Sequence, residues 1–122
     1  MSLNLESVRK LIEPVTRVGG VEGFVVSTSD GLPLLSSLTD KDLEEKIAAL
    51  TAVLAEVGNR ASVELGKGEA DWITVNAPDG SGIIYIKLGE MGYLAVLFGR
   101  DTRLGVLLYT LRDIKKKVSS LV

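Results

Sequence analysis

Apolar residues recur along the chain in two distinct rhythms. In residues 4–18 they stand at every third or fourth position, as in a helix with one buried face. Gly19 and Gly20 follow and are expected to end that helix, while Pro14 is expected to shorten or kink it. Residues 103–120 repeat the rhythm with a stripe of Leu, Ile and Val, and Asp101 or Thr102 is expected to cap them. Both ends of the chain are therefore predicted to be amphipathic helices.

Shorter apolar runs in the middle of the chain predict five strands. The runs 23–29 and 32–38 flank Asp30-Gly31, a dipeptide typical of hairpin turns. Pro33 cannot donate to a strand ladder, so the second strand is expected at an edge of the sheet. The runs 71–77, 82–88 and 92–99 are joined by short glycine-rich connections, which indicates antiparallel neighbours.

Several of these runs are apolar on both faces, so helices must cover the sheet from both sides. The predicted fold class is α+β, an α/β/α sandwich with a five-stranded antiparallel sheet. Its elements follow the order helix, strand, strand, helix, strand, strand, strand, helix. If the strand order across the sheet is second, first, fifth, fourth, third, the third strand forms an edge. We expect residues 1–122 to form a single domain, since one core suffices for this length.

The helix predicted for residues 41–65 carries more apolar surface than one sheet can cover. Projected at about 100° per residue, its mostly large apolar residues form a stripe that we expect to pack on the sheet: Leu43, Ile47, Leu50, Leu54, Val57 and Ala61. Beside it runs a stripe that is small except for Asn59, made of Ala48, Thr51, Ala52, Ala55, Gly58, Asn59 and Ser62. We expect this second stripe to contact the same helix of a second copy. The alternative is an exposed alanine face, present only for helix propensity.

The third predicted strand supports self-association, because it would form a bare edge that invites pairing with its own copy. The alternative is that Glu69 and Asp71 protect this edge. The predicted dimer interface is the small stripe together with four strand residues: Ala48, Thr51, Ala52, Ala55, Gly58, Asn59, Ser62, Trp72, Ile73, Thr74 and Val75.

The remaining side of the long helix is charged but includes an exposed valine. Single exposed apolar residues are common, so this side is only weak evidence for a surface that binds another protein. The predicted partner surface consists of Lys46, Ala49, Val53, Glu56 and Arg60.

The amino-acid composition excludes several classes of catalytic and binding site. The chain has no Cys and no His, which excludes disulfides, thiol nucleophiles, imidazole bases and the usual zinc sites. No phosphate-binding GxxxxGK[ST] motif is present. A net charge of −2 and 5% aromatic residues argue against nucleic-acid binding. We therefore expect no enzyme activity, no cofactor, no metal and no catalytic residue.

Signals for membranes are also weak. The longest purely apolar run, residues 93–98, is far too short to span a bilayer, and the first residues lack the apolar core of a signal peptide. Lys115, Lys116 and Lys117 are fewer than the usual polybasic cluster, so we interpret them as a solvated helix end. A cytoplasmic location is the expectation.

Several stretches together resemble the Roadblock/dynein light chain family, including its MglB-like prokaryotic members. They are VEGFVVSTSDGLPLLSS at residues 21–37, the long Ala/Leu helix, GYLAVLF at 92–98 and RLGVLLYTLR at 103–112. The resemblance implies a sheet with the long helix on one face and the terminal helices on the other. It also implies homodimers, or heterodimers with a related roadblock chain, joined through the long helix and the third strand.

The resemblance further implies a function. Family members bind Ras-like small GTPases as regulators or scaffolds, and others are subunits of dynein or of lysosomal scaffold complexes. MglB-like members accelerate GTP hydrolysis by their partner without supplying an arginine finger. The first hypothesis is thus a homodimeric regulator or scaffold that modulates the nucleotide cycle of a Ras-like GTPase. The alternative is a structural assembly subunit without effect on GTP turnover. A third class, a small-molecule sensor or enzyme, would need a pocket with convergent polar groups.

Overall fold

The computed structural model describes residues 4–121 and contains the predicted elements in the predicted order. Two short 3₁₀ helices, η1 and η2, are added to them. The elements are α1 (Leu5–Ile12), η1 (Glu13–Arg17), β1 (Val21–Ser27), β2 (Pro33–Ser36), α2 (Lys41–Glu64), β3 (Trp72–Asn76), β4 (Gly82–Lys87), η2 (Gly89–Met91), β5 (Tyr93–Phe98) and α3 (Leu104–Ser119).

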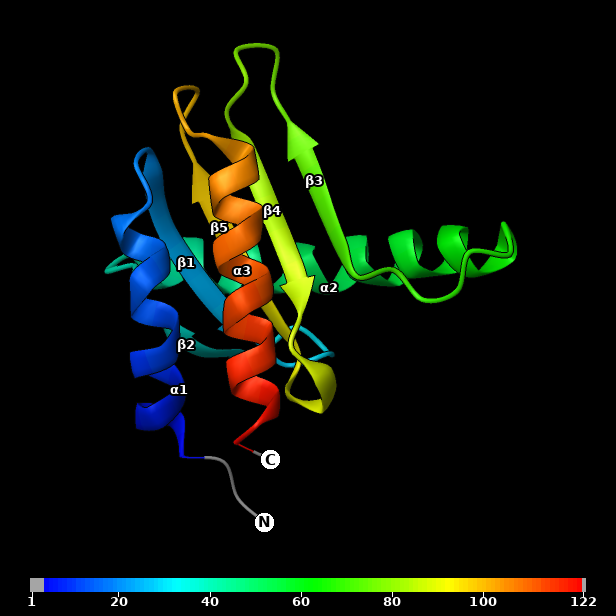
Figure 1. Ribbon diagram of the computed structural model, residues 1–122, viewed down its shortest axis with the longest axis horizontal. Helices are drawn as coiled ribbons and strands as arrows, with labels where there is room; N and C mark the ends of the chain where they lie inside the picture. Colours follow the sequence, from blue (N-terminus) through cyan, green and yellow to red (C-terminus); the bar gives the residue numbers. More distant parts are fainter. Residues whose placement is uncertain (1–3, 122) are drawn as a thin grey trace.

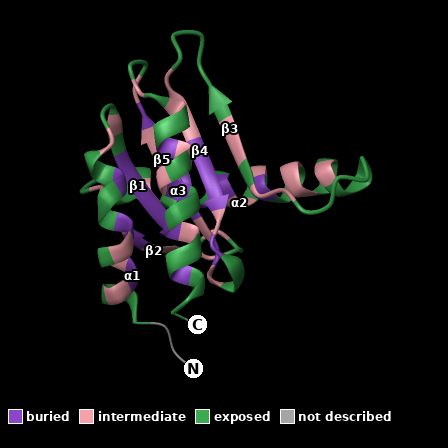
Figure 2. Ribbon diagram, viewed as in Figure 1, coloured by how far each residue is buried: buried purple, intermediate pink, exposed green. Residues whose placement is uncertain are grey.

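The five strands form one antiparallel sheet in the order β2-β1-β5-β4-β3, which confirms the prediction (Figure 1). Pro33 lies in β2 at one edge, where its missing N–H costs no ladder bond. The opposite edge is β3, whose residues are half-buried or exposed (Figure 2). The central strands β1, β4 and β5 carry most of the buried strand residues.

Helices cover both faces of the sheet, with α1 and α3 on one side and α2 on the other (Figure 1). The larger apolar core lies on the side of α1 and α3 and contains Phe24, Phe98, Leu107 and Leu111. A smaller core lies under α2 and consists of Val25, Ile47, Ala48, Ala55, Tyr85 and Ala95. The α/β/α sandwich of the prediction is therefore present.

Two helix ends show how local chemistry sets the boundaries. The first helix stops at Ile12 and continues as η1 with Pro14 near its start, so the proline shortens the α-helix as predicted. The last helix differs from the expectation, because its N-cap is Arg103, which makes no side-chain capping bond. Neither Asp101 nor Thr102 caps it, and the buried Thr102 hydroxyl has no hydrogen-bond partner among residues 4–121.

Helix α2 is the longest element, with 24 residues, and it reaches beyond the sheet that it covers (Figure 1). Its first turn is capped by Asp40, whose carboxylate accepts from the backbone N–H groups of Asp42 and Leu43. The helix then crosses the strands, and its C-terminal turns run past β3. This overhanging part has no sheet of its own chain beneath it.

The assignment of the two stripes of α2 was wrong for most residues, since only Ile47 and the half-buried Leu54 of the stripe expected on the sheet pack on its core. Two of the small residues, Ala48 and Thr51, are completely buried against the sheet, together with Ile47 and Ala55. Gly58 also faces the sheet, because a side chain there would collide with Ile73 of β3. The physical reason is distance: small side chains let the helix backbone come closer to the strands than leucines would.

The large residues are turned outward as a consequence. Leu50 is 54% exposed and Val57 is 62% exposed, although both were expected to pack on the sheet. Of the predicted sheet-packing stripe, only Ile47 is buried. The surplus apolar surface of α2 therefore consists mainly of large side chains.

The close packing of α2 predicts that a larger side chain destabilises the fold at Ala48 but is tolerated at Ala49. Ala48→Leu should lower the free energy of unfolding by roughly 1–3 kcal/mol, because the added atoms must enter a filled space. Ala49→Leu places the same atoms on the exposed side of the same turn and should change it by less than about 0.5 kcal/mol. Denaturant unfolding at one protein concentration measures both. Equal losses in the two variants would contradict this packing.

Candidate functional site

One flank of α2 presents large apolar side chains to solvent. We call this the apolar flank; it comprises Leu43, Leu50, Leu54, Val57 and Ala61, of which all but the half-buried Leu54 are exposed. A helix of a lone domain normally hides such residues. Exposed apolar residues gathered on one flank are typical of a surface that contacts another molecule.

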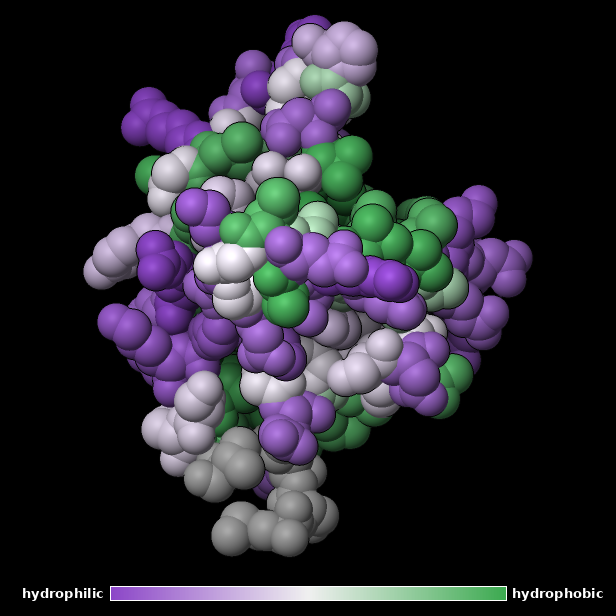
Figure 3. Space-filling model, turned by 90° about the vertical axis from the view of Figure 1, so that its right-hand side faces the viewer, coloured by the Kyte–Doolittle hydropathy of each residue, from purple (hydrophilic) through white to green (hydrophobic). Residues whose placement is uncertain are grey.

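The edge strand β3 lies next to the overhanging end of α2. In the part of the chain that the structure describes, β3 pairs with β4 alone, and its other edge faces solvent. Trp72 and Val75 are exposed on it. Figure 3 shows this side of the molecule, where hydrophobic surface lies among charged side chains. A bare strand edge and an apolar helix flank thus occur on the same side.

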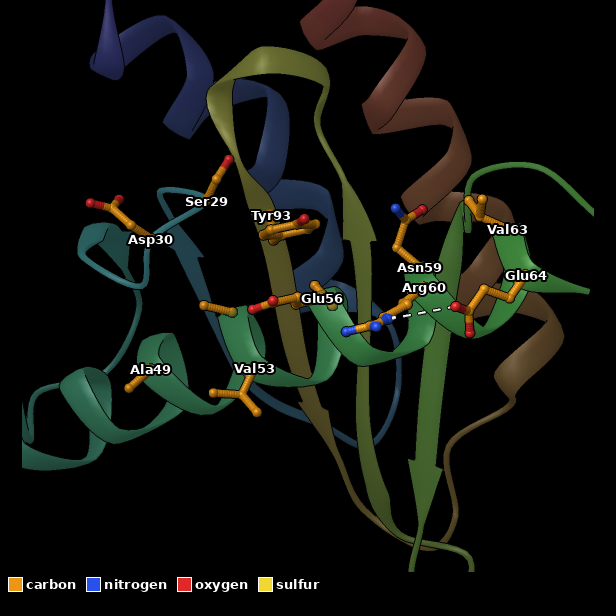
Figure 4. A pocket seen from close by; sticks show the side chains of 12 residues that line it. Ser29, Asp30, Ala49, Val53, Glu56, Asn59, Arg60, Val63, Glu64 and Tyr93 are labelled. Carbon is orange, nitrogen blue, oxygen red and sulfur yellow. Dashed lines mark ion pairs between the residues drawn. The ribbon is translucent and has the colours of Figure 1, made fainter.

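The other flank of α2 borders an open groove of about 940 Å³ (Figure 4). Its walls are α2, the turn that follows β1 and the start of β5, which contributes Tyr93. Four of the five predicted partner-surface residues line it, and Lys46 does not: the four are Ala49, Val53, Glu56 and Arg60. The sequence missed Ser29, Asp30 and Tyr93, because only the folded sheet brings the hairpin turn and β5 beside this helix.

The groove is lined by a mixture of apolar and charged groups. Arg60 and Glu64 form an exposed ion pair at 3.8 Å, a kind of contact that contributes little stability. At the opposite end, the Thr28 hydroxyl donates to Asp30 over 2.5 Å, and this bond holds the pKa of Asp30 below its usual range. Val53, 59% exposed, lies between these charged ends. Such a surface suits a protein partner with matching apolar and charged groups.

Tyr93, which lines the groove, packs against Tyr85 of β4. The rings of Tyr85 and Tyr93 meet edge to face with centroids 5.9 Å apart. Burial raises the pKa of Tyr85, whose hydroxyl has no hydrogen-bond partner within the described residues. A partly open space of about 40 Å³ beside Tyr85 and Asn59 could hold a water molecule and is too small for a metabolite.

Asn59 ties α2 to the edge of the sheet. Its side-chain oxygen accepts a hydrogen bond of 2.9 Å from the backbone N–H of Ala70, two residues before β3. Asn59 was predicted at the dimer interface as part of the small stripe. The structure gives it this structural bond and places it on the groove side of α2.

The other predicted interface residues divide into two groups. Ala48, Thr51 and Ala55 are buried under the chain's own sheet, so a second copy cannot reach them, and their assignment to a dimer interface was wrong. Gly58 is turned toward Ile73 in the same way. The remaining positions stay a prediction: Ala52, Ser62, Trp72, Ile73, Thr74 and Val75, which are half-buried or exposed.

Residues 4–121 contain neither a cluster of metal-ligating side chains nor a helix of membrane-spanning character. No three acidic side chains gather there in a way that could hold a metal ion. None of the helices described is long and apolar enough to cross a bilayer.

Comparison with known proteins gives the family. The Roadblock/LC7 domain profile matches residues 8–98, most of the chain. The chain belongs to the Roadblock/LC7 family. The resemblance inferred from the sequence is thereby confirmed.

Solved structures agree with this assignment. The Roadblock/LC7 domain from Streptomyces avermitilis is 26% identical, with a TM-score of 0.82 over 91% of this chain and 93% of that one. Myxococcus xanthus MglB is 13% identical, with a TM-score of 0.84 over 97% and 96%. A chain in the LokiProfilin1/rabbit actin complex is 13% identical, with a TM-score of 0.61 over 100% and 98%. The last two share the fold, which is the roadblock or profilin-like one predicted. No curated protein sequence matches significantly.

The bond from Asn59 predicts a selective effect on the stability of this Roadblock/LC7 domain. Asn59→Ala removes the acceptor of the half-buried Ala70 N–H and should lower the free energy of unfolding by about 1 kcal/mol. Asn59→Asp keeps an acceptor oxygen and should retain most of that stability. Denaturant unfolding of the two variants is the measurement, and indistinguishable midpoints would show that this bond contributes nothing.

Proposed function

We propose that the protein is a non-enzymatic, homodimeric regulator or scaffold that binds a Ras-like small GTPase and modulates its nucleotide cycle. The observation that carries the proposal is the association of three unpartnered features in one place: the overhanging end of α2, its apolar flank and the bare edge of β3. A second copy would cover all three. Membership of the Roadblock/LC7 family and the fold shared with MglB support a role in GTPase regulation or scaffolding.

A two-fold axis perpendicular to the sheet would relate the two copies so that all three features are covered. Antiparallel pairing of β3 with its copy about such an axis continues the sheet across the dimer. The same axis keeps both α2 helices on one face, so each overhanging helix end gains a sheet beneath it. An axis within the sheet plane would place the two helices on opposite faces and leave both overhangs uncovered.

The place where α2 crosses β3 determines which flank of the helix would face the second copy. Gly58 crosses β3 at Ile73, near the start of the strand, and Asn59 on the groove side bonds to Ala70 before the strand. The apolar flank therefore faces the later half of β3. The two-fold axis brings the second helix over that later half, so Leu50 and Val57 would pack against it.

The groove on the other flank would remain open in this dimer. We assign the docking of the GTPase to it, with Val53 as the apolar contact and Glu56 and Arg60 as charged contacts. Holding a switch segment of the GTPase in one conformation would change its nucleotide cycle by binding one state more tightly than the other. The protein itself would contribute no reacting group.

Two valines on opposite flanks give a crossed test of the dimer. Val57→Glu should weaken dimerisation by roughly a hundredfold or more, because it buries an unpaired charge in each copy. Val53→Glu, at a similarly exposed position, should leave the dimer intact. Light scattering across a range of concentrations measures both. A dimeric Val57→Glu with a monomeric Val53→Glu would reverse our choice of flank.

The GTPase is tested in two steps. The tagged protein should capture a Ras-like GTPase from the lysate of the cell that makes it, in one nucleotide state more than in the other. The purified GTPase should then change its rate of GTP turnover when the protein is added. Val53→Glu should weaken its binding about tenfold while remaining dimeric. Recovery of its own copies or of a large assembly, with no GTPase, would favour a structural subunit instead.

A further inference from the structure

Charge is unevenly distributed between the terminal helices and the rest of the chain. Residues 4–121 hold every charged side chain of the sequence. The layer formed by α1, η1 and α3 with its cap Arg103 carries eight basic and three acidic side chains, a net charge of +5. The rest of the chain carries six basic and thirteen acidic side chains, a net charge of −7. The small overall charge of −2 therefore conceals a basic layer of terminal helices, although Asp71 from outside this layer pairs with Lys115 of α3.

The basic charge of this layer is accessible. We call the layer the basic layer; its positive residues are all exposed except the half-buried Arg9 and Lys115, and they are Arg9, Lys10, Arg17, Arg103, Arg112, Lys115, Lys116 and Lys117. On α3 the residues Leu107, Leu111, Ile114 and Val118 face the core. Arg112 and Lys116 fall on the opposite side of the helix, one turn apart.

Some of these basic side chains form ion pairs and others do not. Lys115 pairs with Asp71, and Lys117 pairs with Asp113 at 3.0 Å. No carboxylate of residues 4–121 lies within ion-pair distance of Arg112 or Lys116. Tyr109, 75% exposed, stands in the same row and lines an open hollow with these two residues and Asp113, whose carboxylate is paired with Lys117. The outer side of α3 thus combines unpaired cations with an amphipathic ring.

Dimerisation would double this surface on one side, and this step rests on the proposed function. The two-fold axis that keeps both α2 helices on one face also keeps both basic layers together on the other. Two copies of α1 and α3 would then present one broad basic surface. The acidic side, with α2, would point away from it.

We propose that the basic layer docks on the surface of a bilayer that contains anionic phospholipid. A bilayer is flat and extended, so both basic layers of a dimer can engage it at once. Each basic side chain near such a surface strengthens binding about fivefold. Exposed tyrosine favours the headgroup region, where its ring is half in apolar surroundings. Repulsion of the acidic side fixes the orientation, with α2 and its groove facing away from the lipid.

The test is co-sedimentation of the full chain with vesicles of phosphatidylcholine, with and without phosphatidylserine. The wild-type protein should bind only the vesicles with phosphatidylserine, and high salt should release it. Arg112→Glu with Lys116→Glu should weaken this binding at least about twentyfold. The matched control is Lys41→Glu with Lys67→Glu, the same charge change at two exposed residues outside the basic layer. It should bind within about threefold of the wild type, since its positions face away from the lipid.

The possible outcomes distinguish binding to lipid from binding to another polyanion, and they test the dimer separately. Absence of phosphatidylserine-dependent binding, or an equal loss in both double variants, would overturn the proposal. Binding to polyglutamate or DNA without binding to the vesicles would also overturn it and assign the layer to another polyanion. Light scattering of the same samples reports the dimer independently. A monomeric wild type that still needs Arg112 and Lys116 for lipid would refute the dimer while supporting the lipid surface.

Discussion

The close approach of α2 to the sheet is the constraint on which the rest of the molecule depends. Ala48, Thr51 and Ala55 are buried there, and Gly58 leaves no room for a side chain beside Ile73. A helix that lies this near to the strands can place only small residues beneath it. Its leucines and valines are consequently turned to the sides. The apolar flank is thus a direct result of how the helix packs.

The length of α2 adds a second consequence to its packing. The helix is longer than the sheet is wide at the point where it crosses, so its last turns extend past β3 (Figure 1). An amphipathic helix end without a sheet beneath it is marginal in water, because most helix stability in proteins comes from tertiary packing. The neighbouring edge of β3 is also unpaired. A second copy would cover the end of α2 and pair with the edge of β3. The proposed dimer therefore follows from these two elements together.

The sandwich also separates the molecule into sides with different tasks. The sheet divides the terminal helices, which are basic on balance, from α2, which is acidic on balance. In the proposed dimer the basic side would meet lipid, the middle would join the copies, and the groove beside Val53 would stay open to a GTPase. A scaffold with this arrangement would hold its partner close to a membrane without spanning it.

The sequence by itself determined the elements, their order and the arrangement of the sheet. Local signals were sufficient for this: Asp30-Gly31 for the hairpin, Pro33 for an edge strand and Pro14 for the early end of α1. It also predicted four of the groove residues, because helical periodicity alone places Ala49, Val53, Glu56 and Arg60 on one side. Family membership could be inferred from the same pattern.

Only the tertiary structure decided which side of α2 faces the sheet. Two adjacent stripes of the helix could both be buried, and periodicity cannot choose between them, since the choice depends on how near the strands allow the backbone to come. Tyr93 and Asp30 likewise join the groove from segments far away in sequence. The basic layer was missed for the same reason: Lys115–Lys117 alone are too few, and the other basic residues join them only when α1 and α3 lie side by side on one face of the sheet.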